Sequence, residues 1–168
     1  MGVQHGLQHY LSGYPPAVLA EAQWLLDQRR IGSLIAARYP LAHTVRTDRA
    51  LYDFVSALKS EFMRSAEPIA KVVYDARMQV MQHTLGTHTT VSRVQGTRLK
   101  AKREIRVASV FRQAPAAFLK MIAVHELAHL KEREHGRAFY ALCLHMEPAY
   151  HQLEFDVRLW LAAREVEG

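Results

Sequence analysis

The chain has a single cysteine, Cys143, and no long apolar run. One thiol cannot form an internal disulfide, which fits a reducing compartment, and we expect the protein to be cytoplasmic. No stretch approaches the roughly 20 apolar residues of a transmembrane helix, and the first 14 residues show no basic segment followed by an apolar one. We therefore expect neither a membrane partner nor a signal peptide. The composition, 49% hydrophobic and 23% charged, is that of a globular protein.

The stretch from Phe118 to Leu130 is almost entirely apolar and contains the pattern His-Glu-x-x-His. A helix that is apolar nearly all round is buried, where unpartnered imidazoles and a carboxylate would be costly. At about 100° per residue, His125 and His129 lie about 40° apart and one turn removed, so they can bind one metal ion. Glu126 falls about 60° from His129, outside the ligand pair. This is the layout of zinc hydrolases, in which the Glu accepts a proton from the metal-bound water.

His135 is the third ligand that the sequence offers. On an unbroken helix it would point about 240° away from His129, so it can bind only if the helix ends near Leu130 or Lys131 and the chain turns back. The polar run at 131–134 permits such a turn. Three protein ligands with one open position are typical of a catalytic zinc site.

Other interpretations of these residues remain open. Glu147 or Glu154 could supply a carboxylate as the third ligand. The motif histidines could be ordinary core residues, with Glu126 paired to Lys120 or Arg133. A closed structural zinc site of the usual cysteine-rich kind is disfavoured by the single cysteine. Several side chains after the motif could stabilise an oxyanion: Tyr140, Tyr150, His145 and His151.

Short segments across residues 68–163 add a family resemblance. They are HELAHLK at 125–131, His135-Gly136, Phe139-Tyr140, Glu147-Pro148 and Tyr150. These segments resemble the YgjP-like metallopeptidases, a zincin family. The resemblance implies a zinc-dependent hydrolase core with ligands at His125, His129 and His135 and a general base at Glu126. The end of the motif is also similar to SprT-like proteases, which act on DNA–protein crosslinks. Many YgjP-like proteins carry Trp-Gly-Ser-Cys before the motif, where this chain reads THTTVS at 87–92.

Residues 1–67 are predicted to form a helical N-terminal module. Pro15-Pro16 opens a helix, and Gly32 is the expected break before a second short helix. Thr47 is a good N-cap for a third helix that ends before Pro68. The sequence leaves open whether this module is a lid on the catalytic core, a separate domain or part of one core.

Residues 68–168 are predicted to form a zincin-like core, which makes the fold class α+β. A short helical piece at 69–74 would precede a small antiparallel sheet. In zincins an edge strand beside the metal can pair with an extended substrate. The expected strands lie at 78–81, 88–94 and 105–111, and further helices at 137–146 and after Pro148.

A basic stretch at 93–106 accompanies the net charge of +6. Only Glu104 interrupts its sign. This stretch could bind nucleic acid. It contains no aromatic residue that could stack on bases, and basic runs of this kind more often form a solvated loop and strand face. The basic residues are Arg93, Arg98, Lys100, Lys102, Arg103 and Arg106.

The sequence thus predicts a zinc metallopeptidase that hydrolyses peptide bonds in a peptide or protein substrate. Zn²⁺ on His125, His129 and His135 would lower the pKa of a water molecule to about 7, and Glu126 would accept its proton. The alternatives are a zinc-containing nucleic-acid-associated protein without turnover, or a protease acting on DNA-bound proteins.

Overall fold

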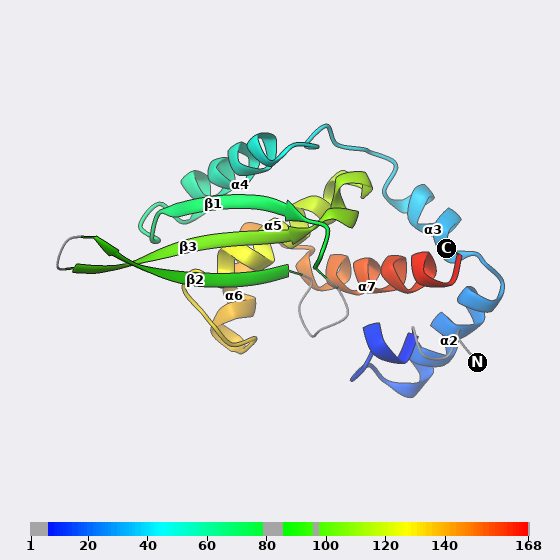
Figure 1. Ribbon diagram of the computed structural model, residues 1–168. Helices are drawn as coiled ribbons and strands as arrows, with labels where there is room; N and C mark the ends of the chain where they lie inside the picture. Colours follow the sequence, from blue (N-terminus) through cyan, green and yellow to red (C-terminus); the bar gives the residue numbers. More distant parts are fainter. Residues whose placement is uncertain (1–6, 79–85, 96–97, 168) are drawn as a thin grey trace.

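The computed structural model describes residues 7–78, 86–95 and 98–167 and shows an α+β fold that combines helices with a three-stranded sheet (Figure 1). No helix in these ranges is long and apolar enough to cross a bilayer. The elements are α2 (Pro16–Asp27), α3 (Ile31–Arg38), α4 (Asp48–Phe62), β1 (Ile69–Asp75), β2 (Gly86–Gln95), β3 (Arg98–Ala108), a 3-10 helix (Ser109–Gln113), α5 (Ala116–Ala128), α6 (Arg137–Met146) and α7 (Tyr150–Glu167).

The sheet is mixed, in the order β1-β3-β2. β2 and β3 form an antiparallel hairpin, as predicted, whereas β1 runs parallel to β3. The prediction of a wholly antiparallel sheet is therefore wrong, and so is the helical piece predicted at 69–74, which is β1. The strand expected at 105–111 ends at Ala108, where the 3-10 helix begins. The strand expected at 78–81 falls, apart from Met78, outside the described residues.

Helix α4 begins at the predicted cap. The Thr47 hydroxyl accepts a hydrogen bond from the Ala50 N–H at 3.1 Å, which satisfies one of the free donors of the first turn. Asp48, the next residue, accepts from the Tyr74 N–H at 2.9 Å. The start of α4 is thereby fixed to β1, beside which it lies in Figure 1.

The break between α2 and α3 lies earlier than predicted. Arg29 has a φ of 52°, and its N–H donates to the Leu26 carbonyl, while Arg30 donates to the Leu25 carbonyl. These two bonds form a Schellman motif, which usually has glycine at the left-handed position. Gly32, the predicted break, lies inside α3.

The buried apolar residues form one continuous core that includes both predicted modules. Ile35 and Val55 from the N-terminal half belong to the same cluster as Val107, Phe118 and Val157. The two predicted parts, 1–67 and 68–168, thus share one core. Their division into two domains stays a prediction.

Asp156 joins α3 to α7. Its carboxylate is fully buried, and both oxygens accept hydrogen bonds from Arg38, at 3.1 and 3.0 Å. The carboxylate also accepts hydrogen bonds from the Tyr39 hydroxyl and the Gln152 amide. Hydrogen bonds to a carboxylate are stronger than those between neutral groups, so these contacts fix α3 against α7.

We expect Asp156→Ala to lower the free energy of unfolding by about 2 kcal/mol, because several charge-assisted bonds are lost while the half-exposed Arg38 can return to water. Thermal or urea unfolding measures the change. Asp53→Ala is the matched control, since Asp53 is exposed and pairs with Arg49, which is also exposed. Equal effects of the two substitutions would contradict the role given to Asp156.

Candidate metal centre

Helix α5 carries the motif through the middle of the core. Every residue from Leu119 to Ala128 except Lys120 is buried. The helix ends at His129, its C-cap, and the Lys131 and Glu132 N–H groups both bond to the Ala128 carbonyl. The predicted end of the helix near residue 130 is thus confirmed, and the turn that follows brings the chain back.

The turn places His135 beside the two motif histidines. The Nε2 atom of His129 lies 3.2 Å from that of His125 and 2.9 Å from that of His135. The ligand atoms of all three residues lie within 4.8 Å of one another. His125 and His129 are buried and His135 is exposed, so the cluster opens toward solvent on the His135 side. These three histidines could hold a metal ion.

Two of the imidazoles are oriented through their other ring nitrogen. His129 Nδ1 lies 2.9 Å from the Glu132 carbonyl oxygen, which can only accept, so Nδ1 carries the proton. His125 Nδ1 lies 2.7 Å from the Tyr150 hydroxyl. Such contacts fix the ring orientation and leave Nε2 free as a ligand, as is usual for metal-binding histidines.

Burial holds the three histidines in the neutral form that a metal requires. It lowers the pKa of His125 well below its ordinary value, and the neighbouring His129 and His135 add to this effect. Burial likewise lowers the pKa values of His129 and His135. Neutral imidazoles do not need to release a proton before they bind a metal.

The arrangement fits a metal ion. With bonds of about 2.0–2.1 Å, two nitrogens of a tetrahedral site lie about 3.3 Å apart, close to the separations found here. Nε2 of His129 carries a lone pair, and it faces two other ring nitrogens at close range. A cation shared by the three would satisfy them all.

Glu126 is fully buried, and neither carboxylate oxygen has a hydrogen-bond partner among the described residues. Burial raises its pKa to about 8. A buried carboxylate without a partner is costly and is more often found at functional sites than in structural cores. The pairing of Glu126 with Lys120 or Arg133, considered from sequence, is not formed.

The alternative ligands have other partners. Glu147 pairs with Lys120 at 3.4 Å and accepts from the Ala149 N–H, and Glu154 pairs with Arg158 at 2.9 Å. Neither belongs to a group of potential ligands in the part of the chain that the structure describes.

Two residues around the site have roles that sequence reasoning missed. The Phe139 ring lies against all three imidazoles, with centroid distances of 5.0, 4.6 and 4.8 Å to His125, His129 and His135. Tyr150, a candidate from sequence for stabilising an oxyanion, also contacts His125 Nδ1 through its hydroxyl. No local pattern marks either role, because both residues lie on later helices.

Tyr150, which contacts His125, also contacts the single cysteine, Cys143. The Tyr150 hydroxyl is hydrogen-bonded to the Cys143 thiol as well as to His125. Burial raises the pKa of Cys143 to about 12, so the thiol stays protonated. In this buried environment Cys143 is an unreactive core thiol.

We expect Tyr150→Phe to weaken metal affinity about 10–100-fold, because it removes the hydroxyl that orients His125 and leaves the ring packing intact. Competition with a chromophoric chelator measures the affinity. Tyr52→Phe, at a half-buried tyrosine of α4, is the control. Unchanged affinity in Tyr150→Phe would show that this hydroxyl does not support the site.

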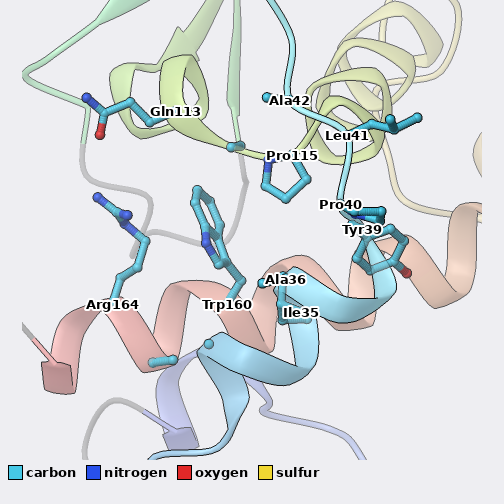
Figure 2. Close-up of a pocket in the computed structure, with 13 residues that line it drawn as sticks. Ile35, Ala36, Tyr39, Pro40, Leu41, Ala42, Gln113, Pro115, Trp160 and Arg164 are labelled. Atoms are coloured by element: carbon cyan, nitrogen blue, oxygen red, sulfur yellow. The ribbon is translucent and has the colours of Figure 1, made fainter.

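A separate pocket of about 380 Å³ lies between α3, the segment 39–42 and the C-terminal half of α7 (Figure 2). Trp160 and Arg164 line it from α7, and the Arg164 guanidinium lies over the Trp160 ring at 5.2 Å. Pro115, also in its wall, precedes His125 by ten residues, about 15 Å along a helix. This pocket is therefore distinct from the metal centre.

Comparison with known proteins agrees with the resemblance seen in the sequence. The model of the family described as "YgjP-like, metallopeptidase domain" matches residues 48–159, from the start of α4 to the middle of α7. The chain belongs to the YgjP-like family. This YgjP-like chain is also 59% identical, over 152 residues, to a protein of Escherichia coli (strain K12) named UTP pyrophosphatase; the match covers 90% of the chain and 91% of that relative. No solved structure matches it.

The family and the histidine cluster together indicate a metal-dependent hydrolase. The family description names peptidase chemistry, whereas the relative's name refers to a nucleotide. The substrate of the YgjP-like chain is therefore a separate question from its catalytic centre.

Proposed function

We propose that this protein is a zinc-dependent pyrophosphatase that hydrolyses UTP to UMP and pyrophosphate. The observation that carries the proposal is the 59% identity to a UTP pyrophosphatase over nearly the full length of both chains. The three-histidine cluster and the buried Glu126 supply a reaction centre suited to this hydrolysis. The zincin-like arrangement predicted for residues 68–168 is part of the same proposal.

The histidines would hold the zinc ion, with His125 and His129 oriented by their Nδ1 contacts. A bound zinc ion would supply positive charge that acidifies a water molecule and stabilises the attacked group. The exposed side of His135 is where substrate and water would reach the cluster.

Glu126 would act as the general base. Burial raises the pKa of its carboxyl to about 8, and a nearby cation would favour the ionised form. The carboxylate would accept a proton from water as the water oxygen attacks the α-phosphorus. The bond to the bridging oxygen breaks, pyrophosphate leaves, and UMP retains the new oxygen. A base with a pKa near the working pH is effective in such a step.

Peptide-bond hydrolysis is the second candidate. It is the activity predicted from the sequence, and it is favoured by the family description and by the position of β2. β2 is an edge strand of the sheet and packs against α5, the helix of the motif. Its unpaired backbone groups could accept an extended peptide as an added strand. The roles of the histidines and Glu126 would be unchanged.

The nucleic-acid alternatives rest on the basic stretch at 93–106. Its side chains are described only from Arg103 onward. Arg103 pairs with Glu67 at 2.6 Å, and Arg106 pairs with Asp75 at 3.3 Å, so these two charges are partly balanced. Nucleic-acid binding stays a hypothesis, and a mobility-shift assay at low and high salt tests it, because binding through phosphates weakens steeply with salt.

The two hydrolase proposals are separated by offering both substrates to one preparation. Zinc-loaded protein is incubated with UTP, the other nucleoside triphosphates and an unfolded-protein panel, each with and without chelator. We expect chelator-sensitive release of UMP and pyrophosphate. Cleavage of protein without UTP hydrolysis would favour the peptidase. No hydrolysis by a zinc-containing protein would favour a binding function.

A further inference from the structure

A polar pocket of about 250 Å³ lies next to the metal centre. Its walls come from the segment before α2, from α6 and from α7. The lining residues are Ser12, Gly13, Tyr14, Tyr140, Glu154 and Arg158.

Helix α7 connects this pocket to the histidine cluster. Tyr150, Glu154 and Arg158 recur every four residues, so they lie on one face of the helix, about one turn apart. The first of them contacts His125, and the next two line the pocket. On α6, the Tyr140 ring lies 6.1 Å from the Tyr150 ring. The pocket is thus about one helical turn beyond the residue that supports the metal ligand.

The charges of Glu154 and Arg158 also act on the histidines of the cluster. Burial lowers the pKa of His135; the charge of Glu154 acts against this effect, and that of Arg158 adds to it. Arg158 also lowers the pKa of His125. Because Tyr150 contacts both His125 and the ring of Tyr140, which lines the pocket, a molecule bound at the histidine cluster could extend into the pocket.

The charge of the pocket decides which part of a nucleotide it can hold. Glu154 and Arg158 form an ion pair at 2.9 Å, and among the described residues no other charged side chain lines the pocket. The pair is close to neutral, so a triphosphate would meet the Glu154 carboxylate as well as the guanidinium. The neutral end of a nucleotide, its base and ribose, meets no such repulsion.

The polar groups of the pocket match that neutral end. Glu154 bonds to Arg158 through Oε1, which leaves Oε2 as an acceptor for an N–H or a ribose hydroxyl. Arg158 is held in place by hydrogen bonds from Nη1 to the Tyr10 carbonyl and from Nη2 to Glu154. Uracil presents one N–H between two carbonyl oxygens, and its ring can stack on a tyrosine.

We propose that the pocket between Tyr14, Tyr140 and the Glu154–Arg158 pair binds the base and ribose of a pyrimidine nucleotide whose phosphates lie at the histidine cluster. This inference rests on the proposed function and adds to it a nucleoside subsite. Tyr14 and Glu154 act as specificity residues, and neither takes part in the chemical step.

The test uses Tyr14→Leu, which removes a ring, and Glu154→Gln, which keeps the volume but weakens a charge-assisted acceptor. In the zinc-loaded full chain, each should raise KM for UTP about threefold to tenfold with little change in kcat. Inorganic triphosphate, which has no base or sugar, should show no matching rise in KM. Calorimetry should show weaker UMP binding by a similar factor. Tyr52→Leu is the control, and thermal unfolding identifies any variant that fails to fold.

The outcomes separate this inference from the proposed function. If wild type hydrolyses UTP and both variants keep its KM and its affinity for UMP, the subsite is wrong and the proposed function stands. If wild type hydrolyses no UTP but binds UMP through Tyr14 and Glu154, the proposed function fails and the subsite stands. Absence of UMP binding to wild type overturns the subsite. Should Tyr14→Leu unfold, Glu154→Gln alone decides.

Discussion

Glu126→Gln is expected to lose roughly a hundredfold to ten-thousandfold of the hydrolytic rate while keeping its metal. The amide preserves the shape of the side chain but cannot accept the proton. Glu126 is not among the residues of the ligand cluster, so occupancy should stay near that of wild type. Steady-state rates on UTP or on a cleaved peptide, together with elemental analysis, measure both quantities.

Glu147→Gln is the control, because Glu147 is a half-buried carboxylate that already has a partner, Lys120. Equal rates for wild type and Glu126→Gln would remove Glu126 from the mechanism. Loss of metal from Glu126→Gln would instead make this residue a ligand.

The same substitution should change the pH dependence of stability in metal-free protein. The carboxyl pKa is about 8 in the folded chain and 4.5 in the unfolded reference. Between these values the folded state keeps a proton that the unfolded state releases, so the contribution of Glu126 to stability falls as pH rises through this window. Glu126→Gln should therefore exceed wild type in stability at pH 8–9 by a few kcal/mol. Chemical unfolding at pH 5 and pH 9 measures the difference.

His129→Ala is expected to abolish metal binding and, with it, hydrolysis. His129 is the central member of the cluster, since its Nε2 is close to both other imidazoles. Two remaining ligands leave an incomplete site, so the loss of affinity should exceed the 10–100-fold expected for a supporting residue. Elemental analysis and activity after zinc addition measure the effect.

His145→Ala is the control, because His145 is an exposed histidine of α6 that packs against Phe62. Full zinc occupancy in His129→Ala would contradict the three-histidine assignment. Recovery of activity at high zinc would show that affinity alone was lost.

The local features of the fold were predictable from the sequence. The Thr47 cap depends on a hydroxyl three residues from its donor, the Ala50 N–H. The proximity of His125 and His129 depends only on helix geometry. The return of His135 followed from one condition, that α5 must end near residue 130. Such features involve neighbours along the chain.

The errors came from nonlocal pairing and from one unusual residue. In β1 the buried residues are Ile69, Val72 and Tyr74, and the register shift between Ile69 and Lys71 produces a spacing of three that imitates a helix. Its parallel partner β3 lies about thirty residues later. Arg29 ends α2 in a conformation that the sequence would have assigned to glycine.

The supporting residues of the metal centre were unpredictable for a similar reason. Tyr150 reaches His125 across 25 positions, and its partner Cys143 lies on a different helix. The local sequence around Tyr150 and Cys143 does not predict these contacts. Packing of α6 and α7 against α5 creates them.

The hairpin of β2 and β3 has a consequence for self-association. β2 is an edge strand of ten residues, a length of backbone on which a second copy could pair. Pairing along β2 would bring together two chains that each carry a net charge of +6, and repulsion between them would oppose the pairing. Because salt screens that repulsion, concentrated protein should be least prone to aggregation at low ionic strength.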